Sequence, residues 1–138
     1  MIPLSNLYNQ LKRFEYVSFD VFDTLLFRSV SDYRLVFDIV SLKYYEKYKK
    51  RIDDFKNIRM HAESLARANN VGREITLEMI YDNISLDDID KSELMNIECN
   101  VEENICLPNS LMIDILNWCK INKKKIVIIS DIQCHVHI

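Results

Sequence analysis

The hydrophobic pattern along the chain alternates between helical and strand-like segments. Leu4, Leu7 and Leu11 recur at helical spacing and predict a short amphipathic helix. Residues 16–19 then have strand character, and the apolar run at 126–129, which ends in Ser130, predicts a buried parallel strand. Helical spacing dominates between them. Because strands separated by helices usually form a parallel sheet, the pattern predicts an α/β fold with these two strands adjacent and parallel.

The segment between the two strands is predicted to consist of four helices. The first covers about residues 33–50 with Ser31 as its N-cap, and the second runs from Asp53 towards Gly72. The third begins at Thr76, and the fourth follows Asp90, where Glu93 completes a capping-box pattern. A further helix after Pro108 leads into the second strand. The expected inner faces are Val36, Phe37, Val40, Tyr44 and Tyr48 in the first helix, Phe55, Ile58, Ala62, Leu65 and Ala66 in the second, and Leu94, Ile97, Val101 and Ile105 in the fourth.

Composition fits one globular domain and excludes some partners. The 138 residues are 49% hydrophobic and 28% charged, which is enough for a core and leaves no room for a long disordered tail. The formal charge of -3 gives no basic footprint for a nucleic acid. The amino-terminal residues do not resemble a signal peptide and no apolar run reaches membrane-spanning length, so we expect a cytoplasmic protein without a membrane partner.

Cysteine and histidine positions do not indicate a metal centre. The four cysteines, Cys99, Cys106, Cys119 and Cys134, form no CxxC pair and are expected to be buried or half-buried free thiols. Cys134, His135 and His137 lie close together but lack a fourth ligand and supporting groups. His61 is expected on a helix surface without a functional role.

A carboxylate follows the first predicted strand directly. Asp20 stands where the strand ends and is followed by Asp23 and Thr24, while Ser130 ends the second strand. Open α/β sheets place their chemistry at the carboxyl ends of their strands. The alternative is structural: Asp20 and Asp23 could cap a turn that leaves the strand, and Ser130 could be an ordinary strand end.

The residues around both strand ends resemble motifs of a known enzyme family. Residues 16–26, YVSFDVFDTLL, resemble the first motif of the haloacid dehalogenase superfamily, an apolar strand followed by Asp and then by Thr-Leu. Residues 126–131, IVIISD, resemble its second motif, and FDVFDTLLFR is similar to a bacterial subset found beside glycosyltransferases. The resemblance implies a Rossmannoid core from residues 1–27 and 108–138 and an inserted helical cap from 28–107. It further implies that the second half of the core, with the third and fourth motifs, is missing.

The resemblance also implies roles for individual residues. Asp20 would be the nucleophile that forms an aspartyl intermediate, and Mg²⁺ would be held by Asp20 and the backbone carbonyl of Phe22. Ser130 would bind a phosphoryl oxygen, and Thr24 would assist in phosphate binding. Phosphatases of the family carry an acid at the position of Phe22, so Asp23 is the candidate acid and base here.

Two functions remain open from the sequence. The first is a hydrolase of phosphatase or dehalogenase type that acts on a small phosphorylated or halogenated molecule, truncated and inactive alone unless a second chain completes the sheet. The alternative is a non-catalytic remnant or partner-binding helical module. Other polar and aromatic clusters are expected to be structural: Asp53-Asp54 and Asp87-Asp88 as helix caps, residues 123–125 as a solvated basic helix end, and Tyr33, Phe37, Tyr44, Tyr45 and Tyr48 as packing more than as a ligand platform.

Overall fold

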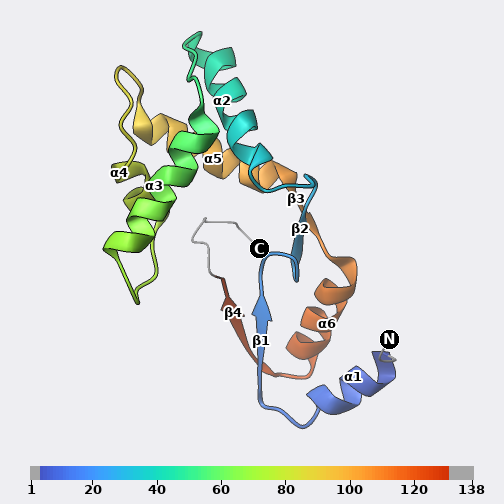
Figure 1. Ribbon diagram of the computed structural model, residues 1–138. Helices are drawn as coiled ribbons and strands as arrows, with labels where there is room; N and C mark the ends of the chain where they lie inside the picture. The colour runs from blue at the N-terminus through green and yellow to red at the C-terminus, as the bar shows by residue number, and fades with distance from the viewer. Residues whose placement is uncertain (1–3, 131–138) are drawn as a thin grey trace. The chain divides into compact units, whose positions relative to one another are not determined.

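The chain is a mixed α/β protein whose elements fall into two units. The computed structural model describes residues 4–130. Residues 4–27 and 107–130 make one unit, called here the strand unit, and residues 28–106 make the other, the helical unit. The elements in chain order (Figure 1) are α1 (Leu4–Leu11), β1 (Tyr16–Asp20), β2 (Leu26–Arg28), α2 (Leu35–Tyr48), α3 (Phe55–Asn69), α4 (Leu77–Asp82), α5 (Lys91–Ile105), β3 (Cys106–Pro108), α6 (Ser110–Ile121) and β4 (Lys125–Ile129).

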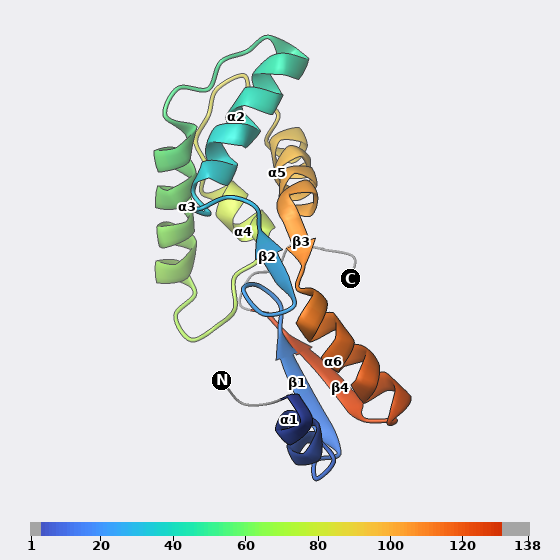
Figure 2. The same ribbon diagram turned by 90° about the vertical axis from the view of Figure 1, so that its right-hand side faces the viewer.

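The strand unit is built on the parallel pair β1 and β4. Their register runs from Tyr16 opposite Lys125 to Asp20 opposite Ile129, and the two strands lie side by side in Figure 2. The expectation of two adjacent parallel strands is therefore confirmed. The helix α6 between them packs against β4 and contributes the buried side chains of Ile115, Leu116 and Cys119.

The expectation that β4 is a buried strand is wrong for the described residues. Val127, Ile128 and Ile129 are 44%, 45% and 57% exposed. In the sheet described by residues 4–130, β4 pairs only with β1, so its outer edge has no strand beside it. Apolar runs of this kind are typical of parallel strands that are covered on both faces, and here α6 packs against this strand without burying these three side chains.

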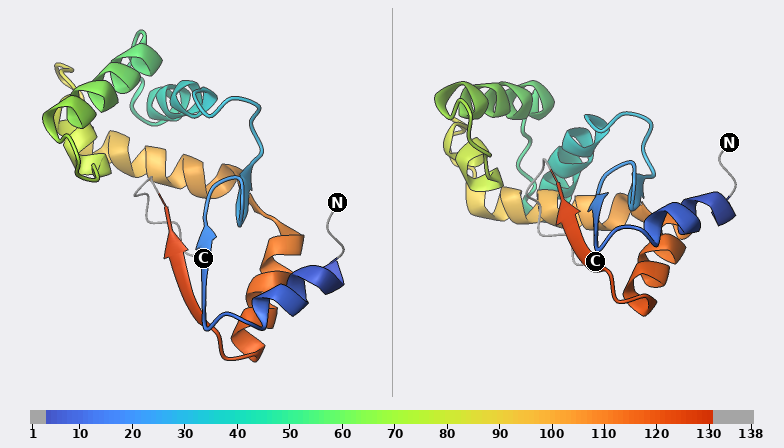
Figure 3. Two further views of the ribbon diagram at one scale, coloured as in Figure 1. Left: turned by 60° about the horizontal axis from the view of Figure 1, so that its bottom comes forward. Right: turned by 90° about the horizontal axis from the view of Figure 1, so that it is seen from below.

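Two lysines of the basic run at residues 123–125 contact the segment that follows the amino-terminal helix α1. The Lys124 ammonium donates hydrogen bonds to the carbonyls of Lys12 and Phe14, at 3.0 and 2.7 Å. Lys125 pairs with Glu15 at 2.6 Å. The rings of Tyr8 and Trp118 lie 5.1 Å apart and join α1 to α6. Figure 3 shows the ribbons of these two helices. The run was expected to be only a solvated helix end, but Lys124 is half-buried and ties the segment after α1 in place.

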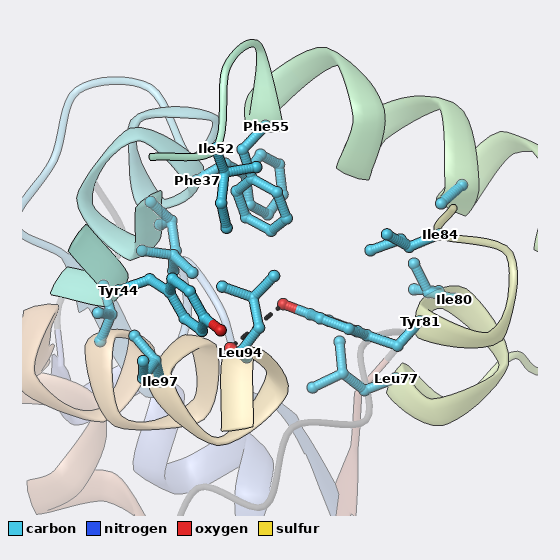
Figure 4. Packing of buried hydrophobic residues seen from close by; sticks show 14 of the residues in the cluster. Phe37, Tyr44, Ile52, Phe55, Leu77, Ile80, Tyr81, Ile84, Leu94 and Ile97 are labelled. Atoms are coloured by element: carbon cyan, nitrogen blue, oxygen red, sulfur yellow. Dashed lines mark hydrogen bonds between the residues drawn. The ribbon is translucent and has the colours of Figure 1, made fainter. Parts of the chain in front are cut away.

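The helical unit has a hydrophobic core of its own, formed by side chains of α2, α3, α4, α5 and the loops between them (Figure 4). Most of the expected inner-face residues are buried or half-buried there. Tyr48 and Leu65 are exposed, contrary to expectation, and the aromatic set is split, since Tyr33 and Tyr45 are also exposed. Tyr48 still stacks on buried Tyr44, with ring centroids 4.7 Å apart.

Three charged residues of the helical unit are buried, and the sequence pattern did not predict them. The Arg59 guanidinium contacts the Glu98 carboxylate at 2.8 Å, and the Tyr81 hydroxyl donates to the same carboxylate at 2.6 Å. Burial alone would lower the pKa of Arg59, but the charge of Glu98 and its hydrogen bonds raise that pKa above its ordinary value. Burial raises the pKa of Tyr81 strongly, so its hydroxyl stays protonated and able to donate. The third residue, Glu102, pairs with Arg28 at 3.1 Å.

Helix starts agree with the sequence at two positions and differ at others. The side chains of Thr76 and Asp90 accept hydrogen bonds from the backbone N–H groups of Met79 and Glu93, as expected of N-caps. Ser31 is not the cap of α2, which begins after Arg34. Asp54 precedes α3 in a left-handed conformation, with φ of 56°, and makes no side-chain cap. Asp88 also has a φ of 56°, so these acidic pairs shape loops more than they cap helices.

The short strands β2 and β3 were not predicted. They form a two-stranded sheet, flanked by hydrogen bonds from Asn109 N–H to the Leu25 carbonyl and from Ser29 N–H to the Ile105 carbonyl, both at 2.8 Å. Between these two bonds the chain advances from Leu25 to Ser29 on one side and goes back from Asn109 to Ile105 on the other. The two strands therefore run antiparallel. The chain thus leaves the strand unit along β2 and returns to it along β3.

Candidate functional site

Asp20 ends β1 and Ser130 directly follows β4, so both stand at the carboxyl ends of neighbouring parallel strands. Asp20 is opposite Ile129 in the parallel register, and Ser130 is the next residue after this last pair. Asp20 is exposed and Ser130 is half-buried, whereas Phe19, directly before Asp20, is buried. The strand therefore anchors the chain through Phe19 and presents the Asp20 carboxylate to solvent.

A tight turn follows Asp20 and fixes the direction of the chain. The N–H of Leu26 donates to the Val21 carbonyl at 2.9 Å, and the N–H of Asp23 donates to the Leu26 carbonyl at 2.8 Å. Asp23 adopts the left-handed region with a φ of 58°. Aspartate tolerates this conformation better than most residues, so Asp23 has a structural reason to stand here besides any chemical one.

Thr24 is brought back to Asp20 by this turn. Its hydroxyl donates a hydrogen bond of 3.2 Å to Oδ2 of Asp20. The bond restricts rotation of the carboxylate and leaves Oδ1 for other contacts. Thr24 was expected to assist in phosphate binding, and in the structure its hydroxyl orients the candidate nucleophile.

The two residues considered for acid and base chemistry have different surroundings. The Phe22 side chain is buried, as are those of Val21 and Leu25, so this position belongs to the packed interior. Asp23 is exposed and lies three residues after Asp20. Its carboxylate is the only acid between Asp20 and the start of β2.

Asn109 supports the turn from far along the sequence and was missed by sequence reasoning. Its side-chain Nδ2 donates to the Thr24 carbonyl at 2.8 Å, and its backbone N–H donates to the Leu25 carbonyl at 2.8 Å. An Asn between Pro108 and a helix is readable as an N-cap, but no local pattern indicates a bond to a residue 85 positions away.

The two oxygen donors that the resemblance assigns to Mg²⁺ are of the kind that a hard cation prefers, but they are few. A carboxylate and a backbone carbonyl, here Asp20 and Phe22, are oxygen ligands of the type that Mg²⁺ prefers. Within residues 4–130, no group of three or more His, Cys, Asp or Glu side chains is gathered as a metal cluster. Mg²⁺ usually keeps several waters and takes further oxygens from a phosphorylated substrate, so two protein donors fit a weakly held ion.

The remaining candidate residues from the sequence lie away from Asp20 along the chain or outside residues 4–130. His61 is exposed on α3, as expected. Cys99 and Cys106 are half-buried and Cys119 is buried, all as free thiols, and burial raises the pKa of each. Asp131 and the group formed by Cys134, His135 and His137 lie outside the described residues.

The helical unit also carries a groove. It lies between α2 and α5 and has a cavity volume of about 810 Å³. Ile39, Ile97 and Val101 line it, and Lys43, Lys47 and Glu93 stand among its polar residues. Lys47 and Glu93 form an ion pair with each other, so this part of the groove is electrically balanced.

Comparison with known proteins adds no relative to this picture. A scan against models of protein families and a search of curated proteins both found no match. Within residues 4–130, none of the helices combines the length and the apolar character needed to cross a bilayer.

Proposed function

We propose that the strand unit carries a phosphoryl-transfer-type hydrolase site of the haloacid dehalogenase kind, with Asp20 as the nucleophile. One observation carries this proposal: Asp20 ends β1 and Ser130 directly follows β4, at the carboxyl ends of adjacent parallel strands, with Asp20 exposed and oriented by Thr24. This is the place where α/β sheets gather reactive groups. The resemblance of residues 16–26 and 126–131 to the two motifs supports the same assignment.

The proposed reaction has two steps. An Asp20 carboxylate oxygen attacks phosphorus or carbon, and the leaving group departs with the electron pair of the bond that breaks. Water then attacks the aspartyl intermediate, which releases the product and restores the carboxylate. The Thr24 hydroxyl keeps the other carboxylate oxygen, Oδ2, in place, so Oδ1 is the attacking atom. The Ser130 hydroxyl supplies a donor for the charge that develops on a phosphoryl oxygen.

The buried Phe22 restricts the class of substrate. An alcohol leaving group needs a proton in the transition state, and a phenyl ring at position 22 has none to give. A carboxylate or halide leaves without a proton. We therefore propose an acyl phosphate or a halogenated acid as the substrate class.

Mg²⁺ is the cofactor that this proposal implies. When bound, it would neutralise charge between the Asp20 carboxylate and the anionic substrate. Asp20 and the Phe22 carbonyl are the residues that would hold it. We expect weak binding, because the described residues form no group of three or more His, Cys, Asp or Glu side chains that could hold the ion.

A second candidate function is a partner-binding helical module in which the Asp20 site is idle. The separate hydrophobic core of the helical unit and the groove between α2 and α5 favour it. In that case neither Mg²⁺ nor Asp20 would matter to the function of the chain.

A magnesium titration separates the two candidates. In the full chain labelled with ¹⁵N, Mg²⁺ is expected to shift amide resonances of residues 20–24, and Asp20→Asn is expected to abolish those shifts. Asp53→Asn is the matched control, because it removes the same charge from an exposed position in the helical unit and should leave the shifts intact. Equal shifts in the Asp20→Asn chain, or none in the wild type, would favour the idle site.

A further inference from the structure

Asn109 occupies a helix-capping position without acting as a side-chain cap. It directly precedes α6, and its backbone carbonyl accepts the first helical bond, from Ile113 N–H at 2.9 Å. Asn at such a position normally uses its side-chain oxygen to bind a free N–H of the first turn. Here no side-chain cap bond is made, and the amide nitrogen instead reaches the Thr24 carbonyl.

We propose that Asn109 is a positioning residue for the Asp20 site. Two hydrogen bonds in series connect them: the Asn109 amide holds the Thr24 backbone, and the Thr24 hydroxyl holds the Asp20 carboxylate. All three residues belong to the strand unit. The two hydrogen bonds are observed whatever the chain does. Their importance for catalysis rests on the proposed function.

The chemistry of the bond requires a donor at position 109. The Thr24 carbonyl only accepts, so the group that meets it at 2.8 Å is the amide nitrogen. Aspartate has nearly the same shape as asparagine but, when ionised, can only accept. Placed at this position it would face the Thr24 carbonyl with a like partial charge and would have to turn away.

For the helix α6, by contrast, Asp or Ser at position 109 should be acceptable. Asp and Ser are as good as Asn at an N-cap, and a negative charge near a helix amino terminus interacts well with the macrodipole. A residue that served only the helix would therefore tolerate both replacements. A residue that positions the turn would tolerate neither, because ionised Asp has no donor and the Ser hydroxyl, one bond closer to the backbone than the Asn nitrogen, does not reach the Thr24 carbonyl. This contrast distinguishes the two roles.

The backbone bond of Asn109 remains in every variant. Its N–H to the carbonyl of Leu25, a fully buried residue, does not depend on the side chain, so the path of the chain through β3 into α6 should persist. The variants therefore test the side-chain bond without unfolding the unit.

Hydrogen exchange measured by NMR on the full chain tests the proposal. In Asn109→Asp and Asn109→Ser, the amides of Asp23 and Leu26, which close the turn, are expected to exchange about tenfold faster than in the wild type. The apparent affinity for Mg²⁺ should fall by a similar factor, while helix content by circular dichroism stays unchanged. Asn122→Asp is the control, because Asn122 makes a bond of the same kind, 2.8 Å to the Trp118 carbonyl, at the other end of α6.

The outcomes distinguish this proposal from the function on which it rests. Wild-type exchange at Asp23 and Leu26 in both variants would overturn it and leave Asn109 as a helix-end residue. Faster exchange there in Asn122→Asp would also overturn it, because the effect would then be a general loosening of α6. If the variants lose protection but the wild type binds no Mg²⁺, the positioning role stands and the proposed hydrolase site fails.

Discussion

Glu98→Ala is expected to lower the free energy of unfolding by about 3–5 kcal/mol. Arg59 and Glu98 are only 5% and 2% exposed, so removing the carboxylate leaves a buried guanidinium without its main partner. The change also takes the acceptor from the buried Tyr81 hydroxyl, although the Leu94 carbonyl stays 3.4 Å away from it. Urea denaturation followed by circular dichroism measures the loss.

An exposed ion pair gives the matched comparison. Lys43 and Glu46 also form a salt bridge on a helix of this unit, but both side chains are more than half exposed. Glu46→Ala should therefore cost less than about 1 kcal/mol. Replacing Arg59 by Met and Glu98 by Leu together should recover most of the loss, since no charge is then left buried. A cost for Glu98→Ala as small as that for Glu46→Ala would contradict the buried network.

Leu94→Ala is expected to cost about 2–5 kcal/mol. Leu94 is fully buried at the start of α5, where it packs in the core that α2, α3 and α4 also line (Figure 4). Truncation removes apolar contacts and leaves a cavity that rigid helices fill only in part.

Leu42→Ala is the control for this prediction. Leu42 lies on α2 and is 55% exposed, so its truncation creates no cavity and should change stability by less than about 0.5 kcal/mol. The same denaturation experiment serves both variants. Equal losses would mean that the helical unit lacks the close-packed core described above.

The regular elements were predictable because each is encoded within a short stretch of sequence. Residues 126–129 predict a strand from their apolar run, and helical spacing predicts α2, α3 and α5. The strands β2 and β3 have three residues each, and their pairing joins segments about eighty positions apart. No local pattern of three residues specifies such a pair.

The buried charged residues show a second reason why sequence patterns do not predict every feature of the fold. Arg59 lies at helical spacing between Phe55 and Ala62, so its position on the inner face could be read from the sequence. Its residue type argued against burial, because charged residues are rarely buried unless they are paired. The partner, Glu98, is 39 positions away, and only the fold shows that the two meet.

The candidate site was predictable only in part: its place at the strand ends was, but the turn after Asp20 was not. Asp20 and Ser130 were expected at one edge because parallel strands end at the same side of a sheet. The left-handed turn at Asp23 and the support from Asn109 depend on hydrogen bonds that the sequence does not reveal.

The most direct test of the proposed function is to trap the covalent intermediate on Asp20. The full chain is incubated with Mg²⁺ and acetyl phosphate, whose acetate leaves without a proton, then reduced with borohydride, which converts an aspartyl phosphate to homoserine. Trapping needs only the first of the two steps, so it does not require the turnover that the chain is expected to lack alone. Peptide mass spectrometry is expected to find homoserine at position 20, and no such product in Asp20→Asn. Homoserine at other acidic positions alone, or unmodified Asp20 under saturating acetyl phosphate and Mg²⁺, would contradict the assignment of Asp20 as a nucleophile.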